Sequence, residues 1–506
     1  MKKKKLIIVG GGTAGWMAAL MLQKSVADFW DIELIESSKR GIIGVGEGST
    51  PALKNFFDEV DIPEESWMPS CRATYKTGIT FDQWSAKAGF ESYFHPFYTY
   101  FDRDHAKALV HHSLLRRAGK DAHAHPDMFS YNHYLARKRL SPVPPYHFPF
   151  DIQYGYHFDA GLLAQFLKKT AVERGVNHTD TLITDVQLGA DGQIAAVIDE
   201  RGERYCADWF IDCSGFAALL IDDALGIPFK SYADSLWNDS AVTLAMPAED
   251  EPACETVSTA LKHGWAWRIP LQSRVGYGYV YSSRYTSKED AEAELREHAA
   301  AGADAEVRHL SMNVGRRESH WVKNCVAVGL SQGFIEPLEA TSLALTQQTI
   351  SRFIHAFKDG NTGQGFVDIF NRAVNRSYDD VRDYISVHFL TNSRTDSTYW
   401  IDNRENPGPV SKELRAVFNC WFDSGDLPGL LKHLKIDGAY SNHSWHYILC
   451  GMGVFPDAVG LNPLVEEDRG NVDLERISDF FNRCAINHES HKEALEKLAI
   501  GSAVSN

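Results

Sequence analysis

The sequence predicts an α/β fold, in which a nucleotide-binding body carries a β layer and is followed by a helical C-terminal part. Three observations predict it. An apolar run, a glycine turn and an apolar segment of helical spacing open the chain at residues 6–26. Apolar and aromatic residues alternate within 240–330, as at Gly276–Tyr281, a pattern typical of antiparallel strands. After Ser342 the apolar residues recur at helical spacing.

The opening segment is predicted to be a βαβ unit. Leu6–Val9 is uniformly apolar, as a strand buried in a parallel sheet requires. Residues 16–26 have helical spacing, and Ile32–Ile35 is a second strand. Beyond it we expect a helix at about 158–175 and strands at 181–188, 194–199 and 204–212.

The C-terminal pattern predicts helices at 346–357 and 367–389, with breaks near Pro407–Pro409 and Pro463. We therefore divide the chain into a body with an inserted β region, residues 1–340, and a helical part, residues 341–506.

Net charge and cysteine content argue against several kinds of partner and site. The net charge of −16 argues against nucleic acid or an anionic membrane as a partner. The eight cysteines contain no CxxC pair, so we expect free thiols in a reducing compartment and no metal site. The apolar run after Met1–Lys5 is too short for a signal peptide, and no stretch approaches the length of a membrane span. A cytoplasmic location is expected.

A glycine turn marks a dinucleotide site. Gly10–Gly15 matches GxGxxG between the first strand and the first helix, where glycines let a pyrophosphate approach backbone N–H groups. Glu36 ends the second strand, about 20 residues after the turn, where a carboxylate can accept hydrogen bonds from ribose hydroxyls. A glycine-rich turn in an unrelated α/β protein is the alternative.

Two further turns contain small residues. Ile211–Gly215 resembles the later nucleotide-contacting segment of flavoproteins, and an ordinary strand end is its alternative. Gly44–Pro51 is dense in glycine and could let a flavin approach the backbone closely. A plain surface loop is the alternative there.

Four stretches together resemble the flavin-dependent tryptophan halogenase family. They are the glycine turn with Trp16 after its last glycine, Gly44–Glu47, the WxWxIP stretch Trp265–Pro270, and Gly333–Thr341. The resemblance extends to at least residue 455. WxWxIP is the most specific of the four, because two tryptophans and a proline at fixed spacing are rare by chance. A strand pair packed in the core is its alternative interpretation.

The resemblance implies an FAD-binding Rossmann-like (GR2-type) domain, with FAD arriving as FADH2 from a separate flavin reductase. It also implies that Trp265 and Trp267, on one face of a strand, form an apolar wall beside the flavin that disfavours direct oxygenation. The residues expected to contact FAD are Gly10, Gly12, Thr13, Ala14, Gly15, Glu36, Gly46, Ser214, Gly215, Leu330 and Leu338.

The implied activity is that of an FADH2-dependent halogenase, in which reduced flavin and O2 oxidise a halide ion to hypohalous acid. Lys76, within Ala73–Ile79, matches the family's signature lysine. It would polarise the acid as an ammonium, or become a haloamine as a neutral amine. Glu339 matches the acid that works with this lysine. It would hold the hypohalous acid, or take the proton from the halogenated ring as a general base. A surface lysine and a helix-start carboxylate are the alternatives.

Thr341 and Ser342 begin the next predicted helix, where free backbone N–H groups make an anion site. We assign halide binding to them. The family usually has glycine where this chain has Ser342.

Aromatic residues are expected to line the substrate cavity. His95, Pro96, Phe97 and Trp445 lie near the family's cavity positions, where rings stack on an indole; a plain core role is the alternative. Residues 440–451 do not show the tyrosine pair and acid with which tryptophan-specific members hold the amino acid. Indole or an indole derivative is therefore the expected substrate.

Two other functions remain open from the sequence. A flavin-dependent aromatic monooxygenase predicts a dispensable Lys76 and an oxygenated product without halide. A non-catalytic flavin-binding protein has no need of Lys76 together with Glu339. A homodimer is among the expected assemblies.

Overall fold

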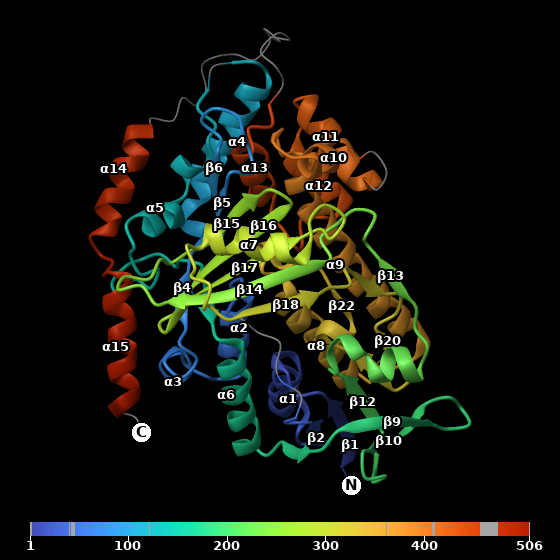
Figure 1. Ribbon diagram of the computed structural model, residues 1–506. Coiled ribbons are helices and arrows are strands. Elements are labelled where there is room, and N and C mark those ends of the chain that lie inside the picture. The colour runs from blue at the N-terminus through green and yellow to red at the C-terminus, as the bar shows by residue number, and fades with distance from the viewer. Residues whose placement is uncertain are drawn as a thin grey trace. The chain divides into compact units, whose positions relative to one another are not determined.

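The computed structural model describes residues 3–39, 41, 46–120, 122–360, 362–406, 410–455 and 474–504, and Figure 1 shows its elements. The chain folds into two compact units, each built from three separate segments. Unit one comprises Met1–Ala73, Phe158–Ala233 and Asn313–Asp379, and unit two comprises Thr74–His157, Asp234–Met312 and Asp380–Asn506. The functional division at residue 340 stays a prediction.

Unit one is built on a six-stranded, mostly parallel sheet in the order β20-β21-β12-β1-β2-β8. β1 is parallel to both of its neighbours, with Ile8 opposite Ile211 on one side and Leu34 on the other. All three side chains are buried, which explains why the strand is apolar throughout. The strands are β20 (Trp321–Val322), β21 (Cys325–Ala327), β12 (Trp209–Asp212), β1 (Lys4–Val9), β2 (Trp30–Glu36) and β8 (Asn177–Asp180).

The predicted βαβ opening and the helix near 158–175 are confirmed. The helices of unit one are α1 (Thr13–Val26), α2 (Ala52–Glu59), α3 (Glu64–Trp67), α6 (Ala160–Glu173), α8 (Ser342–Lys358) and the first part of α9 (Gln364–Leu390). Its two small sheets are β11 (Arg204–Cys206), β10 (Ile194–Asp199) and β9 (Ile183–Leu188), and β13 (Phe229–Ser231), β19 (Gly315–Arg317) and β22 (Gly333–Phe334).

The single strand expected at 204–212 is wrong. Its first part, β11, forms an antiparallel hairpin with β10, whereas its last part, β12, enters the parallel sheet beside β1.

Unit two contains a seven-stranded sheet in the order β18-β14-β17-β16-β15-β5-β6. It is antiparallel, as expected, except that β15 runs parallel to β5. It ends at Ser311 rather than near residue 330, because the later strands belong to unit one. The strands are β18 (Val307–Ser311), β14 (Ser240–Pro247), β17 (Arg274–Tyr281), β16 (Gly264–Pro270), β15 (Thr256–Leu261), β5 (Gly78–Asp82) and β6 (Ser92–Pro96).

The helical C-terminal part is confirmed. Side-chain caps start several of these helices, as where Ser441 accepts a hydrogen bond from the Ser444 N–H. The predicted breaks at Pro407–Pro409 and Pro463 lie outside the described residues. No helix in the described ranges combines the length and apolar character that crossing a membrane requires. The helices of unit two besides α9 are α4 (Arg103–Arg117), α5 (Tyr131–Arg137), α7 (Lys288–His298), α10 (Thr398–Glu405), α11 (Lys412–Phe422), α12 (Leu427–Leu434), α13 (Asn442–Gly451), α14 (Leu474–Ala485) and α15 (His491–Val504).

Candidate active site

The glycine turn joins β1 to α1. Gly10 has φ +111°, and a Cβ there would lie 2.1 Å from the carbonyl oxygen of Cys213, so only glycine fits. A Cβ on Gly15 would lie 2.0 Å from the Gly10 oxygen, so glycine lets α1 begin directly against the strand. No side chain caps α1 at its N-cap, Gly12. The first N–H groups of the helix can therefore bind a pyrophosphate.

A second turn, after β12, is built around Asp212. This buried carboxylate accepts hydrogen bonds from the Ser214 hydroxyl at 2.6 Å and from the Leu220 N–H at 2.9 Å, and burial raises its pKa. Gly215 has φ +74°. Because the Ser214 side chain is engaged within the turn, nucleotide contact by Ser214 and Gly215 would be made by their backbone.

Four parallel strands bring the glycine turn, Glu36, Ser214–Gly215 and Leu330 to one edge of the sheet, where the carboxyl ends of the strands meet. A Cβ on Gly11 would lie 1.6 Å from the Glu36 carboxylate, and one on Gly329 would lie 2.7 Å from the first turn of α1. Glu36 and η5 (Gly329–Ser331), which carries Leu330, therefore both lie against the glycine turn. These residues fit an adenine dinucleotide such as FAD, since its pyrophosphate needs a turn without side chains and its ribose needs a carboxylate.

The glycine-dense turn continues into β3 (Glu47–Gly48). Gly46 has φ +96°, while Gly44 and Val45 lie outside the described residues. Desolvation, with a smaller contribution from the Asp159 carboxylate, raises the pKa of Glu47 to about 7. A carboxyl group that titrates near neutrality is typical of functional sites, and the sequence analysis did not single it out.

Lys76 is the last residue of β4 (Thr74–Lys76), which pairs antiparallel with β7 (Gly155–Phe158). The residue is 1% exposed, so it is not a solvated surface lysine. Its Nζ lies 5.5 Å from the centroid of the Phe97 ring, a distance at which the ring face favours a charged ammonium.

Hydrogen bonds hold the backbone on both sides of Lys76. The N–H of Tyr75 donates to Nε2 of His491 at 3.1 Å, and the N–H of Thr77 donates to the Cys254 carbonyl at 2.7 Å. Burial lowers the pKa of His491 to about 4, so its ring is neutral and accepts the Tyr75 hydrogen bond. The sequence analysis missed His491, which begins α15 far from any motif.

The WxWxIP stretch forms β16. Trp265 and Trp267 lie two residues apart on this strand, and their ring centroids are 5.9 Å apart. Gly278 stands opposite Trp267 on β17, and a Cβ there would lie 2.0 Å from the indole. Trp267 thus lies across the neighbouring strand, where only glycine leaves room. Its place beside a flavin stays a prediction.

Glu339 and the predicted halide residues belong to unit one. Glu339 is buried at the end of η6 (Pro337–Glu339). Ala340 follows in the left-handed conformation, with φ 55°, and Thr341 is the N-cap of α8 without a side-chain cap. The first N–H groups of α8, from Ser342 onward, therefore meet the requirement for an anion site.

Two of the expected substrate residues, His95 and Trp445, meet around Tyr384 of α9. The Tyr384 ring stacks on Tyr440 at 3.6 Å, with 9° between the planes, and lies edge-on to Trp445 at 5.0 Å. The His95 ring lies 6.0 Å from it, and the Tyr384 hydroxyl donates to the Ser444 carbonyl at 3.0 Å. The sequence analysis missed Tyr384 and Tyr440, because single tyrosines in such segments form no motif.

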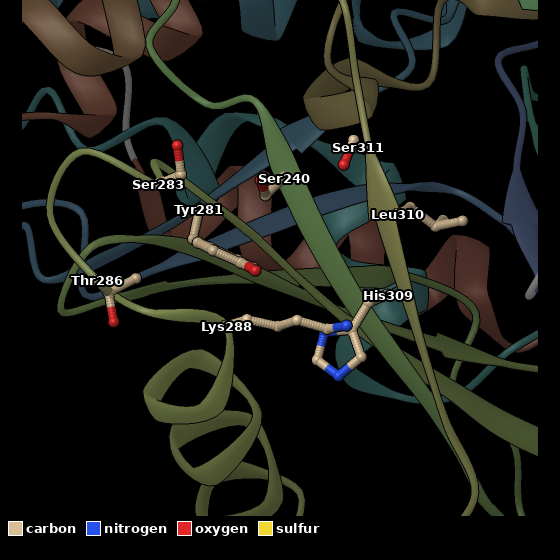
Figure 2. A pocket seen from close by; sticks show the side chains of 8 residues that line it. All are labelled: Ser240, Tyr281, Ser283, Thr286, Lys288, His309, Leu310 and Ser311. Carbon is tan, nitrogen blue, oxygen red and sulfur yellow. The ribbon is translucent and has the colours of Figure 1, made fainter.

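A polar pocket of about 250 Å³ opens at the β18 and β14 side of the seven-stranded sheet (Figure 2). Figure 2 shows the Lys288 side chain extending toward His309. None of the sequence-predicted site residues lines it. The residues that line it are Ser240, Tyr281, Ser283, Thr286, Lys288, His309, Leu310 and Ser311.

Known proteins match nearly the whole chain. The profile of the tryptophan halogenase family matches residues 5–466. The 7-chloro-L-tryptophan 6-halogenase KtzR of Kutzneria sp. (strain 744) is 38% identical over 448 residues, covering 82% of this chain and 84% of that protein. The tryptophan 6-halogenase SttH of Streptomyces toxytricini is 36% identical over 494 residues, covering 91% and 90%. The solved structure of Tar14, a tryptophan C-6 flavin-dependent halogenase from taromycin biosynthesis, matches with a TM-score of 0.84 at 32% identity, covering 98% of this chain and 100% of that one.

Proposed function

The chain belongs to the tryptophan halogenase family of flavin-dependent halogenating enzymes, and from this premise we propose that it halogenates an indole ring with reduced FAD, O2 and a halide ion. The observation that carries the proposal is the burial of Lys76 on a strand that is hydrogen-bonded to the WxWxIP strand. A buried ammonium at this place suits an enzyme that must bind and direct an oxidised halogen.

Bound reduced FAD supplies the electrons with which O2 oxidises the halide to hypohalous acid. In unit one, the N–H groups at the start of α1 would hold the pyrophosphate, and Glu36 would accept hydrogen bonds from the ribose hydroxyls. The proposed FAD contacts are Gly10, Gly12, Thr13, Ala14, Gly15, Glu36, Gly46, Ser214, Gly215, Leu330 and Leu338.

We propose that the start of α8 binds the halide ion through the backbone N–H groups of Thr341 and Ser342, which the helix dipole makes attractive to an anion. The Ser342 side chain, which is exposed, stands beside these donors.

In the proposed mechanism, the Lys76 ammonium donates a hydrogen bond to the oxygen of hypohalous acid. The indole carbon attacks the halogen, the halogen–oxygen bond breaks, and the departing hydroxide takes a proton from Lys76 and leaves as water. Glu339 then accepts the proton from the halogenated ring carbon and restores aromaticity. The Phe97 ring, 5.5 Å from Nζ, supports the ammonium route over a haloamine, because a ring face stabilises the charged form.

For the substrate we propose indole or an uncharged indole derivative, bound near His95, Pro96, Phe97 and Trp445. KtzR and SttH are named for tryptophan substrates, but residues 440–451 contain no Asp, Glu, Lys or Arg. Burial lowers the pKa of both His443 and His446 to about 4, so these residues are neutral at neutral pH. This segment thus offers aromatic surface without a charge for an amino acid's carboxylate.

A flavin reductase that delivers FADH2 is the proposed partner, and a homodimer stays a prediction. All eight cysteines are free thiols, which supports the cytoplasm as the proposed compartment.

The test supplies FADH2 through a reductase and gives the enzyme indole or tryptophan with chloride, bromide or iodide. Mass spectrometry of the products should show halogenated indole, with tryptophan a poorer substrate. An oxygenated product that forms equally without halide would contradict the proposal.

A further inference from the structure

A lysine and a histidine side chain lie against the Glu36 carboxylate. The Nζ of Lys168, on α6, donates to Glu36 Oε1 at 2.8 Å, and Nε2 of His178, on β8, lies 3.2 Å from the same oxygen. The Glu36 and His178 side chains are 15% and 19% exposed, and that of Lys168 is 35% exposed. Elements outside the glycine turn therefore set the position of this carboxylate.

The Trp16 ring packs near both Lys168 and His178. This buried ring lies 5.7 Å from the His178 ring and 6.0 Å from the Lys168 Nζ. The Lys168 ammonium thus lies near both a carboxylate and a ring face, which each attract a cation. On the other side, Glu36 Oε2 packs so close to Gly11 that a Cβ there would lie 1.6 Å away. Glu36 is held from both sides.

We infer that Lys168 is a positioning residue for the adenosine ribose of FAD and that it acts through Glu36; this rests on the proposed FAD site. A carboxylate that accepts hydrogen bonds from ribose hydroxyls must be ionised and fixed in orientation. The ammonium fixes Oε1, while Oε2 can accept a hydrogen bond from a ribose hydroxyl.

The test compares Lys168→Met with Lys169→Met, which removes the same charge one residue along the same helix from a side chain that is 76% exposed. The Kd values of FAD, ADP and 2′,3′-dideoxy-ADP are measured by titration calorimetry. Because a charge-assisted hydrogen bond is lost, Lys168→Met should weaken FAD and ADP about tenfold. It should leave 2′,3′-dideoxy-ADP unchanged, because that nucleotide lacks both ribose hydroxyls. Lys169→Met should match the wild type with all three.

A double-mutant cycle tests whether the effect passes through Glu36. In a Glu36→Gln background, Lys168→Met should weaken ADP no further, because the group on which it acts has gone. A purely structural role would instead lower ADP affinity in both backgrounds.

Equal weakening of ADP and 2′,3′-dideoxy-ADP would overturn the inference, because Lys168 would then act on the phosphates or on the fold. An unchanged ADP affinity would overturn it too. If the methionine variant does not fold, Lys168→Gln provides the same comparison with a neutral donor. A wild-type chain that binds neither FAD nor ADP would contradict the proposed function itself.

Discussion

The hydroxyl of Thr74 donates a hydrogen bond of 2.7 Å to the carbonyl of Pro270, 196 residues away in the sequence. It joins the strand that ends at Lys76 to the WxWxIP strand. The same hydroxyl lies 3.1 Å from Nδ1 of His157, whose Nε2 lies 2.9 Å from the Thr256 hydroxyl. Burial, with the nearby Lys76 charge as the next cause, lowers the pKa of His157 well below its usual value. A neutral ring thus completes a buried network behind Lys76.

Thr74→Val should destabilise the protein and slow halogenation. The substitution keeps the shape of the side chain but leaves the Pro270 carbonyl and a His157 ring nitrogen without this partner, at a cost of about 1–3 kcal/mol in the free energy of unfolding. Urea denaturation measures the loss. Thr243→Val is the matched control, because Thr243, on β14, is buried like Thr74 but its hydroxyl makes a hydrogen bond of only 3.5 Å. Equal losses in the two variants would contradict a special role for Thr74.

Part of the fold and of the proposed FAD site could be predicted from the sequence, because residues that are close together in the chain determine them. The glycine turn, Glu36 and the buried Leu6–Val9 strand are close in the chain, and a short motif fixes their geometry. Lys76, in contrast, is indicated by the resemblance of Ala73–Ile79 to the family's lysine segment.

The partners of these residues could not be predicted. The Thr74–Pro270 hydrogen bond and the Tyr384–Tyr440 stack join distant segments, and neither residue pair has a spacing that marks it. Their meeting follows from the strand order and helix packing, which depend on the whole chain. The pKa of Glu47 likewise depends on burial, which a glycine-rich segment does not reveal.

Stability should fall in acid partly because of His491. Its folded pKa of about 4 is below the usual 6.5, so the unfolded chain takes up the proton first. The stabilisation is therefore present above pH 6.5 and is lost as pH falls toward 4. For this one group the loss between pH 7.5 and pH 5 is about 2 kcal/mol.

His491→Gln should reduce that pH dependence, because the amide can still accept the Tyr75 N–H but does not titrate. Chemical denaturation at pH 7.5 and pH 5 gives the two free energies of unfolding. His355→Gln, at an exposed position on α8, should leave the wild-type dependence intact. An unaltered pH dependence in His491→Gln would contradict the assignment.

Glu47 should contribute a pH dependence of opposite sign. Its folded pKa of about 7 lies above the usual 4.5, so the folded chain holds the proton more tightly. The corresponding stabilisation is present below pH 4.5 and is lost as pH rises through 7. Glu47→Gln should therefore lose less stability than the wild type between pH 5 and pH 8, as measured by thermal unfolding. Parallel curves for the two proteins would show that Glu47 does not titrate in this range.

Ser342→Gly should change the halide preference. Removing the side chain beside the first N–H groups of α8 makes room for a larger ion. The ratio of the KM for bromide to the KM for chloride should therefore fall by about threefold, because small differences in the size of a ligand change its binding only modestly. The KM for indole serves as the internal control and should not change. Identical KM values for both halides in variant and wild type would place the halide elsewhere.

The central claim is that the Lys76 ammonium directs the oxidised halogen onto the ring, and Lys76→Met tests it most directly. With FADH2, O2, bromide and indole supplied, the measurement is the amount of bromoindole formed per FADH2 oxidised. The account predicts a fall of about 100-fold or more, with unchanged FADH2 oxidation and FAD affinity. Lys107→Met, at a side chain that is 68% exposed, should match the wild type. Normal bromoindole yield from Lys76→Met would contradict the account.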